Sequence, residues 1–268
     1  MDRRRALLAA SQTGGDFKPI IDINNYLTIE ALEDGLTARL STNECEYCVD
    51  GDGNWKTLSA STNTDSINIG QTLSFRGELI PDTPDGIGTF TISKKCNLLG
   101  NCMSMLYGDN AANKFSLSGN NYAFRALFDN CYTIISVSKK FLPATTLSRA
   151  CYSQLFQYCS GLTTPPELPA TTMEMDCYSS MFRGCGGLTS APELPATTLK
   201  IMCYSSMFRD CTKLNYIKML ATDISASSCL NNWVKNVASS GTFVKNKNAT
   251  WTVTGVNGVP SGWTIQKV

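Results

Sequence analysis

The stretch that decides the fold is MFRGCGGLTSAPELPATTLKIMCYSSMFRDC, from Met181 to Cys211. It begins and ends with nearly the same pentapeptide, because Met-Phe-Arg-x-Cys at Met181 returns at Met207, which sets a period of 26. Three motifs recur with this period: Leu-Pro-Ala-Thr-Thr at Leu142, Leu168 and Leu194, Cys-Tyr-Ser at Cys151, Cys177 and Cys203, and Phe-x-x-Cys at Phe156, Phe182 and Phe208. Such a period indicates units that cannot bury their apolar faces alone and stack to build one continuous core.

The pattern weakens at both ends of the repeated region. Upstream, Phe128 and Cys131 keep the Phe-x-x-Cys spacing, with two extra residues before Leu142. Downstream, Cys229 lies one full period after Cys203, although most of the unit has changed. Degenerate terminal units are typical of repeat proteins, because the end units must cover the core.

Each unit has two parts with different signals. Cys177, Met181 and Cys185 stand at i, i+4 and i+8, which predicts an apolar stripe on a short helix. The following LTSAPELP contains two prolines, which exclude a long helix and favour extended backbone. A short strand followed by a short helix in every unit is the plan of a leucine-rich repeat.

The region from 25 to 101 has another pattern. Short alternating segments such as TDSINIGQTLSFRGEL and GIGTFTIS are separated by Asp-Gly, Asn and Pro turns, which predicts a β-sandwich. DGDGN at Asp50–Asn54 lies between EYCV and WKTL and predicts a hairpin turn. The sequence therefore predicts an α+β chain, with an N-terminal β-sandwich followed by a short solenoid of strand and short-helix repeats.

Four segments follow from these patterns: a flexible N-terminal peptide at 1–24, the β-sandwich at 25–101, the repeat solenoid at 102–240 and a C-terminal cap at 241–268. The first segment starts with three consecutive arginines after Asp2, but its apolar run from Ala6 to Ala10 is shorter than a secretory signal requires. No stretch reaches the length of a membrane span, so none is expected.

Composition narrows the classes of function. The 268 residues carry a formal net charge of +1, which gives no electrostatic basis for binding nucleic acid. The chain contains no histidine, which removes the commonest general base, the usual catalytic triads and histidine-containing metal sites. We expect no enzyme activity and no cofactor, although catalysis by carboxylates or lysines stays open.

The 12 cysteines allow several interpretations. Cys45-x-x-Cys48 has no second Cys-x-x-Cys partner, so packing thiols are favoured over a zinc or redox site. The cysteines of the repeats are expected to form two ladders of small buried groups. Equivalent cysteines such as Cys185 and Cys211 would lie about 5 Å apart, however, which permits a disulfide. A disulfide among Cys45, Cys48, Cys96 and Cys102 also stays open.

Asp50, Asp52 and Asn54 also resemble the start of a calcium loop. The resemblance fails at the sixth and twelfth positions, which are Trp55 and Ser61 instead of Gly and Glu. We therefore predict a turn here and no metal site.

The whole repeat, LTSAPELPATTLKIMCYSSMFRDCTKL, resembles the BspA-type leucine-rich repeat, whose usual unit carries Ala-Phe-x-x-Cys-x-x-Leu. Together with GIGTFTISKKCN, SLSGNNYAF, LNYIKMLATDIS and VPSGWTIQ, it is similar to a group of such proteins from Bacteroides-like gut bacteria and their phages. The resemblance covers about Tyr26 to Gln266. It implies a surface-exposed, non-catalytic adhesion or binding role.

Binding is expected on the exposed strand residues of successive units, which form a polar and uncharged surface that suits a carbohydrate or a protein loop. The predicted ligand-binding residues are Thr163, Thr164, Thr189, Ser190, Asn215, Tyr216 and Lys218. The alternative is that these residues are only a soluble surface.

Three hypotheses of function follow. The first is a phage or prophage virion component (a fibre, decoration or receptor-binding protein) that contacts a glycan or protein of a bacterial surface. Its N-terminal peptide would bind other virion proteins, and a homo-oligomer stays open. The second is a BspA-like adhesin on the bacterial cell surface. The third is a carbohydrate-active enzyme that uses acids such as Glu167 and Glu193, although repetition alone explains their spacing.

Overall fold

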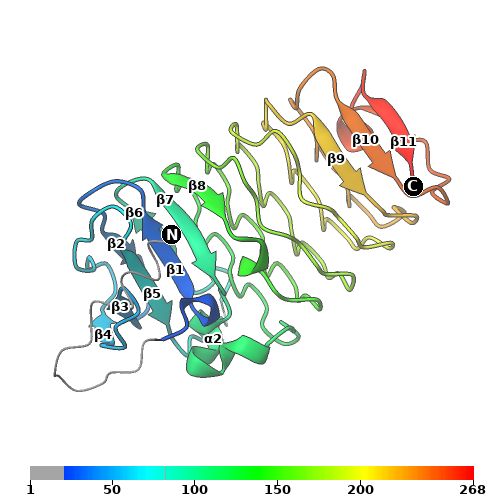
Figure 1. Ribbon diagram of the computed structural model, residues 1–268. Helices are drawn as coiled ribbons and strands as arrows, with labels where there is room; N and C mark the ends of the chain where they lie inside the picture. Colours follow the sequence, from blue (N-terminus) through cyan, green and yellow to red (C-terminus); the bar gives the residue numbers. More distant parts are fainter. Residues whose placement is uncertain (1–20, 82) are drawn as a thin grey trace.

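The computed structural model describes residues 21–81 and 83–268. The predicted flexible peptide at 1–24 lies outside the described residues, except for its last four positions. Most of the N-terminal part forms one six-stranded sheet with the order β4-β3-β5-β1-β7-β8, and a separate two-stranded sheet joins β2 and β6 (Figure 1). These strands are β1 (Leu27–Ala31), β2 (Ala38–Leu40), β3 (Cys45–Val49), β4 (Lys56–Leu58), β5 (Thr72–Arg76), β6 (Phe90–Ile92), β7 (Cys96–Gly100) and β8 (Ile134–Val137).

The six-stranded sheet connects the two predicted domains. Its strands pair antiparallel up to β7, and β7 then pairs parallel with β8, which belongs to the repeated region. The buried side chains form one continuous cluster from Leu27 of β1 to Trp263 near the C-terminus. The sheet therefore crosses the sequence boundary that we predicted between residues 101 and 102.

The remaining elements are short. A three-stranded parallel sheet with the order β11-β10-β9 closes the C-terminal end. The elements not yet named are η1 (Ile23–Asn25), α2 (Ser104–Tyr107), η2 (Gly108–Asn113), η3 (Lys139–Phe141), β9 (Tyr216–Met219), β10 (Thr242–Lys245), η4 (Gly255–Asn257) and β11 (Thr264–Lys267). In the described part of the chain α2 is the single α-helix, with four residues.

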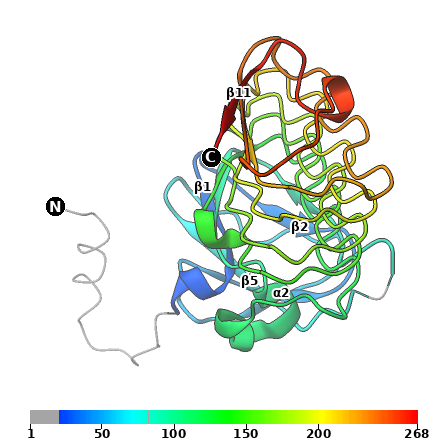
Figure 2. The ribbon, with the colours of Figure 1, turned by 90° about the vertical axis from the view of Figure 1, so that its right-hand side faces the viewer.

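Successive repeats lie side by side, and the predicted helix of each is a ribbon of consecutive turns (Figures 1 and 2). In residues 176–184, alternate N–H groups bond the carbonyl three residues earlier, as Met181 does with Tyr178. The N–H groups between them bond the next repeat, as Tyr178 does with Cys203 and Phe182 with Met207. We call these ribbons, at 122–130, 150–158, 176–184, 202–210 and 228–236, the turn side.

Left-handed backbone makes this ribbon possible. Asp176, Ser180 and Gly184 have positive φ, at a spacing of four residues. Glycine adopts this geometry freely, and aspartate and asparagine adopt it at low cost. The ribbon thus has an apolar period of four, so an i, i+4, i+8 pattern fits it as well as it fits a helix of 3.6 residues per turn.

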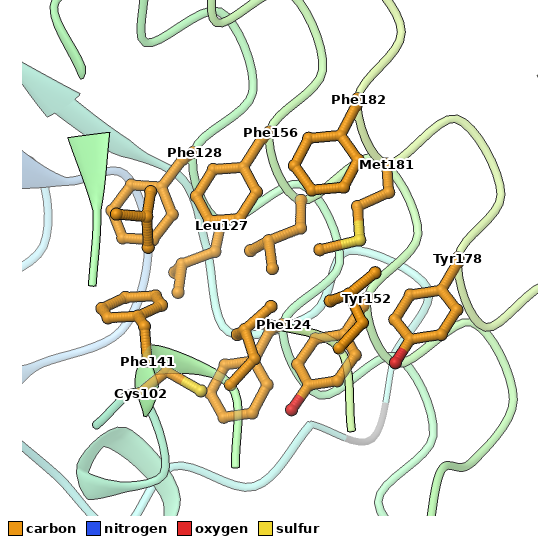
Figure 3. Close-up of a cluster of buried hydrophobic side chains, with 14 of the residues drawn as sticks. Cys102, Phe124, Leu127, Phe128, Phe141, Tyr152, Phe156, Tyr178, Met181 and Phe182 are labelled. Carbon is orange, nitrogen blue, oxygen red and sulfur yellow. The ribbon is translucent and has the colours of Figure 1, made fainter. Parts of the chain in front are cut away.

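The interior of the stack consists of repeated rungs. Phe128, Phe156, Phe182 and Phe208 stack with centroids 5.7 to 5.8 Å apart. A second column starts with Phe124, Tyr152 and Tyr178 (Figure 3) and continues to Tyr204. The parallel arrangement of equivalent rings explains why the same aromatic residue returns in each repeat.

The second cysteine of each repeat has a specific partner. The Cys185 thiol donates to the carbonyl of Phe156 in the preceding repeat at 3.0 Å, and the Cys211 thiol donates to Phe182 at 3.0 Å. Cys159 makes the same contact with Phe128 at 3.1 Å. A small side chain that packs well and donates a weak hydrogen bond therefore suits this position.

The fold-class prediction of an α+β chain with a β-sandwich and a leucine-rich-repeat solenoid is wrong. The described chain is mostly sheet with one short helix, and its sheets are mixed sheets that form neither a sandwich nor a regular solenoid ladder. The repeats supply turns and isolated parallel bridges in place of strand–helix units. The physical reason is that ribbon amides bond the neighbouring repeat, whereas a helix would use them internally.

Candidate functional site

The predicted binding residues lie on the side of the stack that carries β8, β9, β10 and β11, which we call the strand side. A parallel bridge pairs Ser136 of β8 with Thr164, and another pairs Ser190 with Tyr216 of β9. The register of β9, β10 and β11 continues this line to the C-terminal end. These pairings give two runs, Ser136 with Thr164, and Ser190 with Tyr216, Thr242 and Thr264, and the period of 26 relates Thr164 to Ser190. All six positions carry a hydroxyl group, and we name them the hydroxyl row.

The predicted binding residues are exposed because each pair of them follows a buried leucine. Leu162, Leu188 and Leu214 are fully buried, and the two residues after each of them are exposed. The structure therefore brings six of the seven predicted residues into two adjacent columns, Thr163, Thr189 and Asn215 beside Thr164, Ser190 and Tyr216. Within the first column, Thr163 donates its N–H to Ile135 and Asn215 donates its N–H to Thr189.

Lys218, the seventh predicted residue, lies two positions after Tyr216 on the same face of β9, with buried Ile217 between them. Its ammonium group forms an ion pair with Glu193 at 2.9 Å. Because both side chains are partly exposed, this pair contributes little to stability, but it neutralises the charge on the face.

The two acids of the enzyme hypothesis are engaged separately. Glu193 pairs with Lys218 of the following repeat, whereas Glu167 pairs with Lys139 of the preceding one at 3.5 Å. A glycosidase needs two carboxyl groups that face one scissile bond. Two surface carboxylates that each bind a lysine provide no evidence for such a pair.

The hydroxyl row continues into the N-terminal sheet. Asn97 of β7 is in register with Ser136 of β8, and the Asn97 side-chain carbonyl accepts from the Ser136 hydroxyl at 2.6 Å. The Asn97 amide in turn donates to Glu30 of β1 at 2.9 Å. One polar band thus runs from β1 to β11 across the predicted domain boundary.

The six hydroxyl groups of the row offer hydrogen-bond donors and acceptors and carry no charge. Each hydroxyl group donates one hydrogen bond and accepts two, and successive positions are about 4.8 Å apart where parallel strands pair. Tyr216, which is 37% exposed, adds an aromatic ring in the middle of the band. Such a surface matches a ligand that is itself rich in hydroxyl groups, or a polar protein loop.

A second polar cluster, which the sequence did not reveal, lies in the N-terminal part. The Arg76 guanidinium bonds Glu46 at 2.7 Å and both carboxylate oxygens of Asp109 at 2.9 Å. It also lies 4.1 Å from the centroid of the Trp55 ring. Tyr26 donates its hydroxyl to Asp109 at 2.8 Å, and burial, with this bond, raises the pKa of Tyr26 to about 12.

A cleft of about 370 Å³ opens beside this cluster, lined by acidic side chains that include Glu44 and Glu78. The partners of Arg76 are 30 and 33 residues away in sequence, so no local spacing could have predicted the cluster. The alternation of Glu44 and Glu46 on either side of buried Cys45 was the only signal in the sequence.

The DGDGN segment is a turn, as predicted. It connects β3 with β4, which pair antiparallel. Asp52 accepts from the backbone and the side chain of Asn54, both at 2.8 Å, while Asp50 accepts from Gln71 and from the backbone of Thr72. Both carboxylates are therefore used within the protein. In the described residues no group of three or more acids or cysteines is arranged to hold a metal ion.

All 12 cysteines are free thiols in buried positions, which confirms the predicted packing role. The disulfide that the sequence left open is not formed between Cys185 and Cys211 or elsewhere. Burial raises the pKa of Cys45 to about 12 and that of Cys48 to about 11. A thiol is a poor nucleophile and metal ligand under these conditions, because the thiolate is the reactive form.

Within the part of the chain that the structure describes, no helix has the length and apolar character needed to cross a bilayer. A scan against protein-family models finds no match, and searches of curated proteins and of solved structures find none either.

Proposed function

We propose that this protein is a non-enzymatic binding module whose hydroxyl row contacts a glycan or a protein on a bacterial surface. The observation that carries the proposal is the hydroxyl row, six hydroxyl-bearing residues at positions related by strand pairing or by the period of 26. Core packing does not require hydroxyl-bearing residues at these positions, because none of the six side chains belongs to the buried core.

The likeness of the repeats to BspA-type sequences supports an adhesion role, and the members from phages make a virion component the preferred setting. In this setting the protein forms part of a fibre, a decoration or a receptor-binding assembly. A bacterial cell-surface adhesin is the alternative. Peptide mass spectrometry of purified particles, outer-membrane fractions and cytosol separates them, since each setting enriches the protein in a different fraction.

Binding is tested with the purified chain on glycan arrays and on intact gut bacteria. We expect Tyr216→Ala combined with Ser190→Ala to reduce binding at least tenfold, because the ring and a neighbouring hydroxyl are lost together. The matched control is Tyr158→Ala, which removes a tyrosine that is 36% exposed on the turn side, compared with 37% for Tyr216. Equal binding by the double variant and the control would rule out the hydroxyl row as the contact surface.

A further inference from the structure

The turn side ends in an incomplete edge. In each of the four interfaces between ribbons, five N–H groups of one repeat donate to carbonyls of the next. In the last complete interface the distances are 2.8 to 3.1 Å. Its donors are Met202, Tyr204, Ser206, Phe208 and Asp210, and its acceptors are Ser227, Cys229, Asn231, Trp233 and Lys235.

The ribbon at 228–236 repeats the donors but lacks most of the acceptors. Val234 donates to the carbonyl of Val256 at 3.3 Å, and the Asn232 N–H donates to the side chain of Asn257 at 2.7 Å. Ser228 and Leu230, which correspond to Met202 and Tyr204, have no carbonyl acceptor for their N–H groups among the described residues.

The acceptors are missing because the coil that follows this ribbon is shorter than the other repeats. Val234 is the equivalent of Phe208, whose acceptor is Trp233, so the same spacing would give Val234 the carbonyl of Val259. Val234 bonds Val256 instead, because the final coil returns early, through η4, and covers only the middle of the ribbon. Backbone donors in buried regions almost always have partners, and Leu230 is only 4% exposed.

A pocket of about 260 Å³ lies where the missing part of the coil would pass. Ser228 and Leu230 line it together with apolar side chains of Ile224, Ala226 and Val253. The pocket therefore combines two donors that lack a carbonyl acceptor, two residues apart, with an apolar wall. As in β-augmentation, backbone hydrogen bonds to such an edge would give affinity and a small pocket would give specificity.

We infer that this edge is a docking site for a peptide segment of a partner protein. The segment supplies two carbonyl groups, two residues apart, to Ser228 and Leu230, and a small apolar side chain to the pocket. The four complete interfaces define this chemistry, because the same two donor positions bond such carbonyls in each of them. A second copy of the chain does not fit in a twofold dimer, because donors would face donors.

Amide hydrogen exchange of the full ¹⁵N-labelled chain tests the inference, with Met202 and Tyr204 as internal references. In the free protein we expect Ser228 and Leu230 to exchange at least about 100-fold faster than these references. The probe is a synthetic peptide with the sequence of residues 224–230 and Cys229→Ala, which copies the segment that covers Met202 and Tyr204. At millimolar concentration we expect it to slow exchange at Ser228 and Leu230.

Two variants provide the control. Val253→Arg fills the pocket and should abolish the effect of the peptide, whereas Val256→Arg should preserve it. The two valines are 45% and 44% exposed, and only Val253 lines the pocket. The inference is overturned if Ser228 and Leu230 are already as protected as the references, if the peptide changes neither amide, or if both variants behave alike. Binding through the hydroxyl row should be the same in all of these proteins.

Discussion

The turn side and the strand side of the repeats follow opposite rules. On the turn side, five backbone hydrogen bonds join each pair of neighbouring ribbons, and aromatic rings stack within them. On the strand side, the middle repeats are joined by isolated bridges, and the exposed residues change from Thr to Ser to Tyr. Residues that recur in every repeat thus pack in the interior, whereas residues that vary between repeats lie on the surface, where a ligand has access.

The largest expected effect concerns the thiols, eight of which lie in the ribbons of the turn side or directly after one. Burial raises the pKa of all 12, to about 12 for Cys151 and Cys203. An unfolded cysteine has a pKa of about 8.5, so raising the pH above that value removes protons from the unfolded state alone. Stability is therefore complete below about pH 8 and falls between the unfolded and the folded pKa values.

The size of this loss follows from the number of thiols. Each deeply buried thiol contributes about 1.4 kcal/mol per pH unit in that window, whereas solvent screening reduces the contribution of the less buried ones. For half of the thiols, the summed loss of stability over roughly two pH units exceeds a typical free energy of unfolding of about 5–15 kcal/mol. Urea unfolding under reducing conditions from pH 7 to pH 10 measures the effect. A midpoint that stays constant to pH 10 would contradict the burial of the thiols.

The second largest effect is expected at Trp233, where both aromatic columns end. Its ring lies 6.5 Å from Tyr204, 6.2 Å from Phe208 and 6.1 Å from Phe243, and its indole N–H donates to Gly258 at 2.9 Å. Trp233→Ala leaves a large cavity and should lower the free energy of unfolding by about 3–5 kcal/mol. Urea denaturation checks the value.

The matched substitution on the strand side is Tyr216→Ala. Because Tyr216 is exposed, its loss should change the free energy of unfolding by less than about 0.5 kcal/mol. If both substitutions have similar costs, the two sides of the stack do not differ in the way that the contacts indicate.

The sequence predicted the parts of the fold that depend on local spacing. The period of 26 placed the buried Phe, Leu and Cys positions correctly, and the Asp-Gly turn between β3 and β4 was confirmed. It did not predict the ribbon, because a period of four and a period of 3.6 cannot be distinguished over the short span from Cys177 to Cys185. The deciding factor is whether an amide bonds its own repeat or the next one.

The site shows the same limit. Periodicity identified the exposed residues after Leu162, Leu188 and Leu214, because each follows a buried leucine at a fixed distance. The extension of the row through Asn97 could not be predicted, since it depends on the parallel pairing of β7 with β8. Contacts between residues far apart in sequence also place Arg76 between Glu46 and Asp109, and no local sequence pattern predicts this arrangement.

A third comparison, with a smaller expected difference than that between Trp233 and Tyr216, concerns two adjacent glycines where the turn side passes into the strand side. A Cβ atom on Gly187 would lie 2.7 Å from the Leu162 carbonyl oxygen and 2.9 Å from that of Ser160, and both are backbone atoms. Gly187→Ala should therefore lower the free energy of unfolding by about 1–3 kcal/mol, as overpacking usually does.

The control is Gly186, where the nearest neighbour of an added Cβ atom would be the Thr212 hydroxyl at 3.8 Å. Gly186→Ala should be neutral or slightly stabilising, because alanine restricts the unfolded chain. Urea unfolding of both variants decides the matter: a large cost at Gly187 alone supports close stacking at this edge, whereas equal costs would mean that the repeats are further apart than their hydrogen bonds require.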